Sequence, residues 1–451
     1  MSRQPASLPV ANPTTSYWLS QKDGLLENIG SNATLPVHSD TVIIGSGISG
    51  AVIAHEILQR DPSAKIVMLE ARNVCSGATG RNVYLCAGGH IKPDRYKSFE
   101  KYQSRYGTEA AKKLSNFEQE NMIEFIKFIK DNEWAGDVDL VEATALLEQA
   151  GGNLEGFKKF GEQDAALRFR VKSAIGAISY PACSVWPRKI VLRILNRAVE
   201  DGLQIYTHTP VRRVSKSETG AGWDVETAKG KIVCNRVFHA TNGYVSSLLP
   251  QFAGKVVPVK ANAAAINPST AYSSLPLEHT CGFQWATDFD YMIQRPTDGM
   301  PLIIGGCDLA HPHSLPGVIG DSDDSVITPE IQAALKAFPQ THLQGWGTET
   351  SVRQSWAGIM GFTAQEMPFI GEVPSHPGQF VVAGYSGHGM ARSFLSSKAL
   401  VQLSYSESLD PRVPSQYLDV KNRLEKTDSI WDELLNKADN AKSSFKLNVK
   451  L

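Results

Sequence analysis

The chain has 451 residues, of which 42% are hydrophobic and 20% charged, and its formal net charge is −1. This composition is ordinary for a soluble globular enzyme. A charge so close to zero gives no reason to expect nucleic acid or an anionic membrane as a partner. The apolar runs at 41–44, 302–304 and 380–383 are far too short to span a bilayer. The length suits two domains, or one domain with another inserted into it.

Cysteine and histidine usage gives no sign of a disulfide framework or a metal site. His311 and His313 lack a neighbouring acid or thiol, so no metal is expected. The N-terminal residues lack the apolar core of a secretory signal. We expect a cytoplasmic protein, with a peroxisomal location as the alternative, because Lys450-Leu451 matches the end of the Ser-Lys-Leu address. Six cysteines without a C-x-x-C pair indicate reduced thiols: Cys75, Cys86, Cys183, Cys234, Cys281 and Cys307.

After an irregular lead-in, residues 1–39, the chain carries a pattern typical of dinucleotide binding. In the lead-in, Tyr17-Trp18-Leu19 offers an anchor against the body of the protein. Residues 41–70 then read as strand, glycine turn, helix and second strand, closed by Glu70. This order of elements, rather than the glycines alone, predicts a bound dinucleotide.

Each residue type in this turn has a physical role. Gly45 permits the tight turn, Gly47 lets the backbone approach a pyrophosphate, and Gly50 lets the helix pack close to the strand. The amino end of the helix presents N–H groups and a positive dipole to the phosphates. Glu70 can accept hydrogen bonds from ribose hydroxyls and would repel a ribose phosphate, so NADP fits less well than NAD or FAD.

Further elements follow in chain order. Apolar residues at spacings of three and four predict a helix over 109–132, and a second helix runs from Arg188 to about Asp201. The last of the following strands ends in the small-residue turn Ala240–Gly243, and ligands bind at such carboxyl ends in open α/β sheets. These strands are expected at 204–207, 211–214, 223–227 and 231–238.

Residues 256–350 change in character, because short strands alternate with turns rich in proline, glycine and aspartate. This favours an antiparallel sheet, with strands at 256–259, 291–294 and 302–304. The chain then returns to a buried-strand pattern at 380–383. A glycine turn at 384–389 and a helix to about Ser404 follow.

Several ordered motifs resemble the D-amino-acid-oxidase (DAO) superfamily of FAD-dependent oxidoreductases. The resemblance covers residues 17 to 405, and the most similar branch is that of γ-glutamylputrescine oxidase and related fungal proteins. Besides the glycine turn, the motifs are Ala71-Arg72, Cys75–Asn82, Gly88–Pro93, Tyr180–Pro187, Ala240–Gly243, Trp356–Thr363 and Gly384–Met390.

The resemblance implies an α/β fold, in which a Rossmann-like FAD-binding domain carries an inserted substrate domain with a mixed or antiparallel sheet. The FAD-binding domain would consist of residues 40–108, 181–255 and 351–405. The substrate domain would consist of 109–180 and 256–350, and 406–451 would form a C-terminal tail. The change in character at 256–350 supports this division independently.

The resemblance also implies which residues bind FAD. Gly387–Met390 would lie against the pyrimidine edge of the flavin, where a helix amino end can stabilise negative charge. No cysteine follows Cys307, so an attachment through a C-terminal cysteine is excluded and non-covalent FAD is expected. The implied cofactor-binding residues are Gly45, Gly47, Ile48, Ser49, Gly50, Glu70, Ala71, Arg72, Ser76, Ala78, Thr79, Arg81, Val211, Thr241, Gly243, Gly387, His388, Gly389 and Met390.

The reaction implied by the resemblance is oxidation of a C–N bond in a small amine or amino acid by hydride transfer to flavin. Dioxygen would be the acceptor, giving hydrogen peroxide. Candidate catalytic residues are His388, Tyr291, Arg353 and Lys260, of which Lys260 would provide positive charge for oxygen reduction. Tyr291, Arg353 and Arg295 are expected on the substrate side, where an arginine could bind a carboxylate. For each arginine, a structural salt bridge is the competing interpretation.

Alternatives stay open at this point. Residues 83–87 interrupt the motif between Gly80-Arg81-Asn82 and Gly88-Gly89-His90, and this insertion could bulge outward or impair flavin binding. A non-catalytic relative, or a dehydrogenase with another acceptor, is therefore the main rival. An NAD-dependent dehydrogenase would not explain the later motifs. Gly384–His388 nearly matches the G-x-S-x-G turn of α/β-hydrolases, but His388 replaces the last glycine. Substrate identity and oligomeric state do not follow from the sequence.

Overall fold

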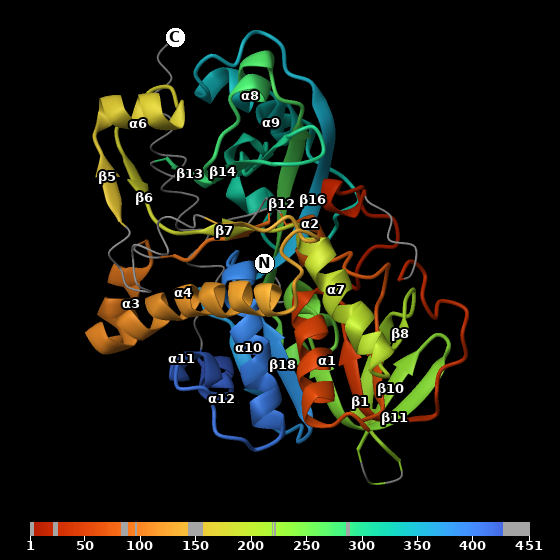
Figure 1. The fold of residues 1–451 in the computed structure, drawn as a ribbon. Coiled ribbons are helices and arrows are strands. Elements are labelled where there is room, and N and C mark those ends of the chain that lie inside the picture. Colours follow the sequence, from red (N-terminus) through yellow and green to blue (C-terminus); the bar gives the residue numbers. More distant parts are fainter. Residues whose placement is uncertain are drawn as a thin grey trace.

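The computed structural model describes residues 4–20, 26–82, 89–94, 97–142, 157–218, 220, 222–285 and 289–426. The insertion at 83–87 and the tail beyond residue 426 lie outside this range. An eight-stranded sheet occupies the lower half of Figure 1 and a five-stranded sheet the upper half. None of the described helices has the length and apolar character needed to cross a membrane.

The eight-stranded sheet has the order β17-β18-β11-β1-β2-β8, and an antiparallel extension runs from β11 through β10 to β9. Its central strands are parallel, and β2 and most of β18 read as continuous apolar runs, as expected for strands covered on both faces. They are β1 (His38–Ile44), β2 (Ile66–Leu69), β8 (Gln204–Tyr206), β11 (Gly230–His239) and β18 (Gln379–Ala383). The antiparallel strands are β9 (Val211–Lys216), β10 (Trp223–Thr227) and β17 (Phe369–Glu372).

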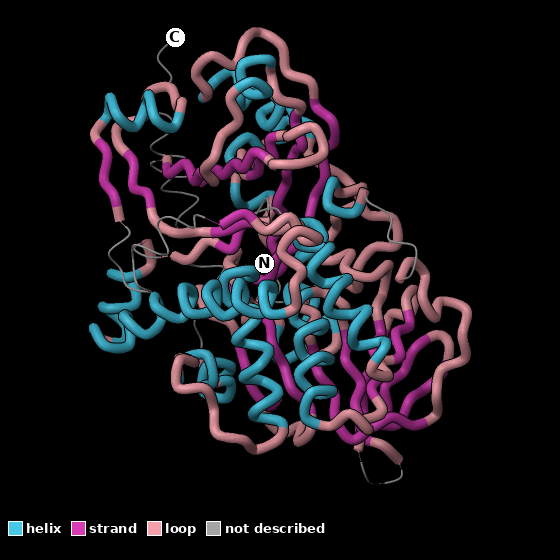
Figure 2. Tube along the Cα trace, in the orientation of Figure 1, coloured by secondary structure: helices cyan, strands magenta, loops and turns pink. Residues whose placement is uncertain are grey.

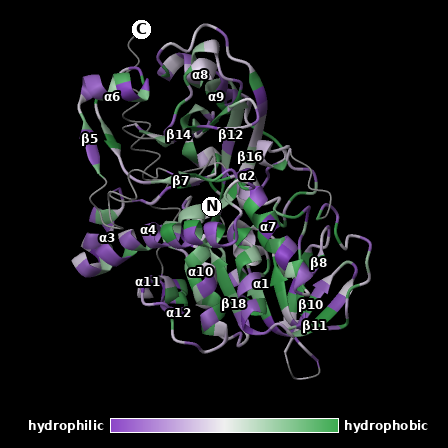
Figure 3. Cartoon of the chain, viewed as in Figure 1, coloured by the Kyte–Doolittle hydropathy of each residue, from purple (hydrophilic) through white to green (hydrophobic). Residues whose placement is uncertain are grey.

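One face of this sheet is covered by helices. Helices α1 (Ile48–Arg60), α7 (Pro187–Glu200) and α10 (Gly389–Ser404) share one hydrophobic core with α4 (Thr108–Asp131). Both long helices expected from the sequence, at 109–132 and 188–201, are thus confirmed within a residue at each end. Figure 3 shows the strands and the helices against them largely in green, whereas α3 (Phe99–Tyr106) and α6 (Glu162–Phe169) at the edge carry more purple.

The five-stranded sheet is antiparallel throughout, as the sequence predicted, with the order β13-β14-β15-β12-β16. Its longest contact joins β12 to β16 along ten residue pairs. Helices α8 (Thr270–Ser274) and α9 (Pro329–His342) lie beside it in the upper part of Figure 2. The strands are β12 (Val257–Ile266), β13 (Cys281–Gln284), β14 (Phe289–Gln294), β15 (Leu302–Gly305) and β16 (Val352–Phe362).

Strand β12 extends well past the predicted end at 259. Its second half carries Ala261, Ala263 and Ala265, which have low strand propensity but are fully buried here. They pack in a cluster with Trp18, Trp186 and other large apolar side chains, so small residues are what this face of the sheet can accommodate. The sequence pattern misses this because propensity describes the residue and not its neighbours.

Smaller elements complete the chain. The expected anchor at Tyr17–Leu19 is confirmed as a 3₁₀ helix whose Tyr17 and Trp18 are buried. Two short sheets join β3 (His90–Ile91), β7 (Cys183–Ser184) and β4 (Val141–Glu142), and β5 (Lys158–Phe160) and β6 (Ala177–Ser179). The remaining helices are α2 (Ala78–Arg81), α11 (Ser415–Leu418), α12 (Val420–Glu425) and the 3₁₀ turns Asn242–Ser247, Pro250–Phe252, Asp308–Ala310 and Leu315–Gly317.

Two elements have neighbours that the predicted domain division did not foresee. Strand β16 was assigned to the nucleotide-binding unit, yet it completes the five-stranded sheet, because its backbone pairs with β12. Helix α4 was assigned to the substrate domain, yet its apolar stripe packs in the core of α1 and α10. The predicted boundaries therefore cut across two structural contacts.

Candidate active site

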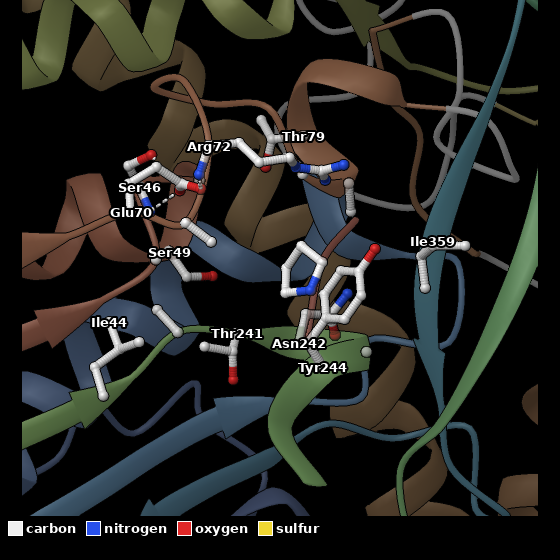
Figure 4. A pocket seen from close by; sticks show the side chains of 18 of the residues that line it. Ile44, Ser46, Ser49, Glu70, Arg72, Thr79, Thr241, Asn242, Tyr244 and Ile359 are labelled. Carbon is white, nitrogen blue, oxygen red and sulfur yellow. Dashed lines mark hydrogen bonds between the residues drawn. The ribbon is translucent and has the colours of Figure 1, made fainter. Parts of the chain in front are cut away.

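A deep cavity lies at the carboxyl ends of β1, β2, β11 and β18, where ligands bind in open α/β sheets. It encloses about 1250 Å³, part of it open to solvent. In Figure 4 Ser46 and Glu70 lie at one end of the cavity and Ile359 at the other, with Tyr244 between them. The implied cofactor residues on its wall are Gly45, Gly47, Ile48, Ser49, Glu70, Ala71, Arg72, Ala78, Thr79, Val211, Thr241, Gly243, Gly387, Gly389 and Met390.

The glycine turn after β1 tolerates no side chain at two positions. Gly45 has φ of +105°, and a Cβ there would lie 2.7 Å from the carbonyl oxygen of Ala240. A Cβ on Gly50 would lie 2.0 Å from the carbonyl oxygen of Gly45. Gly50 is therefore the residue that lets α1 approach the strand, and it packs behind the turn rather than on the cavity wall.

The amino end of α1 faces the cavity. Gly47 is its N-cap and provides no side chain, and Thr79 Oγ1 accepts a hydrogen bond from the amide of Ile48 at 3.2 Å. A Cβ on Gly47 would lie 3.2 Å from the same Thr79 oxygen. The remaining amides of the first turn have no acceptor within the helix, so this end is suited to an anion such as a phosphate.

Glu70 is held against the glycine turn. Its Oε2 accepts hydrogen bonds from the amide (3.0 Å) and hydroxyl (2.6 Å) of Ser46, and its Oε1 accepts one from the amide of Arg72 at 2.9 Å. A carboxylate has about four acceptor sites. Three are thus used within the protein, and one is left on a buried carboxylate that lines the cavity.

The loop after β11 contributes an unsatisfied polar atom to the cavity. The hydroxyl of Thr241, on the wall, is buried and has no hydrogen-bond partner among the residues that the structure describes. Its neighbour Asn242 accepts a hydrogen bond from the amide of Gly384 at 2.9 Å, which ties this loop to the turn after β18. A buried hydroxyl without a partner is costly unless a ligand or water satisfies it. The donor set of this cavity therefore fits a dinucleotide.

The turn after β18 presents the amino end of α10 to the same cavity. Ser386 and Gly387 adopt positive φ angles of 53° and 85°, and the amide of Ser386 bonds to the carbonyl of Gly361 at 2.8 Å. The hydroxyl of Ser386 accepts from the amide of Thr363 and donates to the carbonyl of Gly384. Its hydrogen-bond partners in the described structure are thus all backbone groups, which does not support a hydrolase nucleophile.

His388, the N-cap of α10, is fixed by a carboxylate that the sequence did not single out. Its Nδ1 lies 3.2 Å from Oε2 of Glu118, a fully buried residue of α4. Arg392 donates to the other oxygen at 2.7 Å, and the amide of Asp94 donates to Oε2 at 2.6 Å. Burial opposes the charge on Glu118, but Arg392 and His388 outweigh it and lower the pKa of Glu118 to about 2.

A second, smaller hollow of about 310 Å³, also partly open to solvent, lies next to His388. His388 is flanked by Gly387 and Gly389, which line the first cavity, so the two spaces share this turn. Lys92 Nζ lies 5.2 Å from the centroid of the Phe289 ring, and Lys97 Nζ lies 4.6 Å from it. The hollow thus combines cationic and aromatic side chains; its lining residues are Lys92, Pro93, Asp94, Lys97, Tyr180, Phe289 and His388.

Arg81 and Ser76, which are among the implied cofactor-binding residues, are not on the cavity wall. Arg81 Nε lies 3.2 Å from Asp324 Oδ2, and Arg72 Nη1 lies 3.0 Å from each Asp324 oxygen. The carbonyl of Ser76 accepts from both guanidinium groups. Buried guanidinium groups need such acceptors, so these side chains form a structural clamp, of which Arg72 also touches the cavity.

The expected catalytic residues other than His388 are not among the residues that line either space. Tyr291 is fully buried, and its hydroxyl lies over Gly305 of β15, where any Cβ would collide with it. Lys260 Nζ is 3.1 Å from Asp321 Oδ2. Arg353 is partly exposed and pairs with Asp298 at 3.1 Å. These positions therefore do not support direct contact with a substrate.

Arg295 also makes contacts of a structural kind. It is fully buried, donates to Asp139 at 3.0 Å, and lies 5.4 Å from the ring of Trp18 and 5.6 Å from that of Trp186. The competing interpretation of the arginines as structural ion pairs is thus the one that fits the geometry.

His90 is fully buried. Burial, with help from Lys92 and Arg295, holds the pKa of His90 well below its usual value, so the ring is neutral. Residues 83–87, which precede it and interrupt the motif, lie outside the described range, as does Cys86. Among the described residues, no group of three His, Cys, Asp or Glu side chains is placed to hold a metal ion.

Several wall residues escaped the sequence analysis. Leu8 and Pro9 come from the lead-in. Ile359 and Met360 come from β16 and lie within the recognised motif Trp356–Thr363, but neither was assigned a role. Tyr385 lies within a recognised motif but was not assigned; its hydroxyl is 2.8 Å from that of Ser49. The others are Ile44, Ser46, Leu69, Gly77, Asn82, Pro210, Ala240, Asn242, Tyr244, Ser247 and Leu248.

Comparison with known proteins agrees with this geometry. Residues 40–403 match the model of the family described as FAD dependent oxidoreductase (DAO). A curated relative, the probable oxidoreductase OrdL of Haemophilus influenzae, is 25% identical over 412 residues, covering 84% of this chain and 87% of that protein. The relative is bacterial and described in general terms, so the finer resemblance to γ-glutamylputrescine oxidase and fungal proteins stays a prediction.

Solved structures show the same fold. Glycine oxidase from Geobacillus kaustophilus superposes with a TM-score of 0.63 at 18% identity, covering 85% of this chain and 98% of that one. L-proline dehydrogenase from P. horikoshii gives a TM-score of 0.62 at 18% identity, covering 87% of this chain and all of that one, 100%. The expected α/β fold with mixed and antiparallel sheets is confirmed.

Proposed function

Because the chain belongs to the FAD-dependent oxidoreductase (DAO) family, we propose that it oxidises the C–N bond of an amine or amino acid, with FAD bound non-covalently in the larger cavity. Dioxygen is the proposed acceptor, giving hydrogen peroxide. The observation that carries the proposal is the meeting of two helix amino ends, those of α1 and α10, on one cavity at the carboxyl ends of the sheet.

Different residues would bind different chemical groups of the cofactor. The first turn of α1 and Gly47 suit the pyrophosphate, and the remaining acceptor site of Glu70 suits a ribose hydroxyl. Thr241 supplies an unsatisfied hydroxyl. The flavin, when bound, supplies the hydride acceptor.

The protein's own contribution to the reaction is electrostatic and steric. The N–H groups in the first turn of α10 point a positive dipole end into the cavity, which favours negative charge there. Glu118 bonds to His388 at this helix end, and Arg392 in turn bonds to Glu118, so the position of His388 is fixed. A neutral amine is the form whose nitrogen lone pair can assist oxidation.

We propose the smaller hollow as the substrate site, since it adjoins the same turn from the other side. The hollow is small, which favours a small substrate. Lys92 and Lys97 favour an amine that also carries an acidic group, and Tyr180 and Phe289 offer apolar contact. Glycine oxidase and L-proline dehydrogenase, both similar in fold, act on amino acids by name.

The activity is tested with purified protein and a panel of amines and amino acids. We expect a yellow protein whose flavin bleaches with a substrate in the absence of air and which releases peroxide in air. Bleaching without peroxide, together with turnover of an artificial acceptor, would identify a dehydrogenase. A folded, colourless protein that rejects added FAD would favour the rival of a non-catalytic relative with an impairing insertion at 83–87.

The substrate site is tested separately by removing one positive charge. We expect Lys92→Gln to raise KM for an acidic substrate about 10–100-fold with little change in kcat, because charge-assisted hydrogen bonds contribute about 1.5–3 kcal/mol. Lys112→Gln, on the exposed surface of α4, is the matched control. Equal KM values in both variants would remove the hollow from the proposal while leaving the oxidase activity intact.

A further inference from the structure

The segment of residues 4–16, here called the N-terminal strap, runs along the larger cavity although it lies outside the family match at 40–403. Leu8 and Pro9 belong to the cavity wall. Leu8 remains 38% exposed, so this side chain is not part of the protein core. Core packing therefore does not explain why Leu8 lies at the cavity.

The strap is attached on one side of the cavity near its start. The amide of Ala6 donates to the hydroxyl of Ser246 at 2.8 Å, and the hydroxyls of Ser7 and Ser322 are 2.8 Å apart. Ser246 belongs to the 3₁₀ turn Asn242–Ser247, which itself supplies cavity wall. The strap thus begins on the loop that follows β11.

The second attachment is made by Thr14. Its amide and hydroxyl both donate to the carbonyl of Asp324, at 2.8 and 2.9 Å. The same hydroxyl accepts from the amide of Ala357 at 2.9 Å and from Arg81 Nη1 at 3.1 Å. One threonine thus joins the strap to the Arg–Asp clamp and to β16, the strand that carries Ile359 and Met360 on the opposite wall.

From these contacts we infer that the N-terminal strap is part of the cofactor site and retains FAD. Leu8 and Pro9 cover the cavity between two fixed points, Ser246 before them and Thr14 after them. A ligand that leaves past Leu8 and Pro9 must displace the strap. The inference rests on FAD as the occupant, but it concerns the rate of release and not the reaction.

The test compares two threonines that are neighbours in the strap. Thr14→Val removes the hydroxyl hydrogen bonds of the second attachment and leaves those of the Thr14 backbone, whereas Thr15→Val makes the same chemical change at an exposed position. FAD release from the full-length holoprotein is followed by the rise in flavin fluorescence after dilution. We expect release from Thr14→Val to be about 5–30-fold faster, the factor for one or two lost hydrogen bonds, and unchanged in Thr15→Val.

A second variant guards against loss of folding in Thr14→Val. Replacing Leu8 and Pro9 together by Ala alters only the cavity cover, and we expect release about fivefold faster at unchanged thermal stability of the apoprotein. Equal release rates for both variants, Thr15→Val and the wild type would overturn the inference, even if the flavin still bleaches with an amine.

Hydrogen exchange gives an independent readout without turnover. If bound FAD contacts the strap, FAD should in turn stabilise the strap. We expect the amides of Ala6 and Thr14 to exchange at least about tenfold more slowly with FAD bound, while those of helix α6 stay unchanged. Unchanged exchange in the strap would also contradict the inference.

Discussion

Nη1 of Arg72 lies 3.0 Å from each carboxylate oxygen of Asp324, although the two residues are 252 positions apart in the sequence. Arg81 shares this carboxylate, and all three side chains are buried. Burial, partly offset by Asp324, lowers the pKa of Arg81 to about 10. Asp324, in the loop before α9, is thereby joined to Arg72 and Arg81, which follow β2. Thr14 of the N-terminal strap bonds to both sides of this contact.

Asp324→Asn is expected to destabilise the protein strongly, because it leaves two buried guanidinium groups without their counter-charge. Breaking a buried ion pair on one side costs about 3–5 kcal/mol. Asp323→Asn is the matched control, since the neighbouring side chain accepts a hydrogen bond from the amide of Ser325 near the surface. Urea unfolding of both variants checks this, and similar midpoints would mean that Asp324 does not hold the clamp.

Gly50→Ala is expected to cost about 1–3 kcal/mol, the usual range for overpacking, because its Cβ would meet the carbonyl oxygen of Gly45 at 2.0 Å. The shift of α1 away from β1 would also loosen the cavity, so FAD affinity should fall with stability. Gly136→Ala, where a Cβ meets nothing within 4 Å, is the control. Thermal unfolding with and without FAD measures both effects, and a fully stable Gly50→Ala protein would contradict the packing argument.

The fold was predictable where the pattern is local. Strand β1, the turn at Gly45–Gly50 and helix α1 follow from consecutive residues, and so does the apolar stripe of α4. Most residues expected at the cofactor lie on the cavity because glycine turns at the ends of parallel strands meet at one edge of a sheet.

The rest depends on contacts between distant residues, which one sequence does not encode in a readable pattern. Nothing near Thr14 indicates that its hydroxyl meets Asp324, and nothing near Glu118 indicates that it faces His388. Residue type alone makes Arg353 a candidate, but it does not reveal that the actual partner of Arg353 is Asp298.

Glu118→Gln is expected to weaken the attachment of α4 to the start of α10. At neutral pH it leaves the buried Arg392 without a counter-charge, at a cost of about 3–5 kcal/mol. Glu118 has a pKa of about 2 in the folded protein, so the stability it provides is lost as pH falls from about 4.5 to about 2. The deficit of the variant should therefore shrink over this range.

Urea unfolding at several pH values measures this convergence, and Glu120→Gln on the exposed side of the same helix is the control. Loss of structure confined to α4 and α10, seen by hydrogen exchange, would support the positioning of His388 by Glu118. A deficit that stays constant down to about pH 2 would assign the effect to packing and not to charge.

His239 makes the stability of the protein sensitive to acid in a second, less acidic pH range. Burial lowers its pKa to about 4, against a hydrogen bond to Gln379 that raises it. The unfolded chain therefore binds a proton at a higher pH than the folded protein does, and the stability that the neutral ring provides is present above about pH 6.5 and lost as the pH falls toward 4. A shift from about 6.5 to about 4 corresponds to a loss on the order of 3 kcal/mol.

His239→Gln cannot titrate, so we expect the unfolding free energy of this variant to depend less steeply on pH in this window, by up to one proton. The buried His90 should keep part of the slope in the variant. Urea titrations at steps between these two pH values measure the slope, and identical slopes for variant and wild type would show that His239 titrates normally in the folded protein.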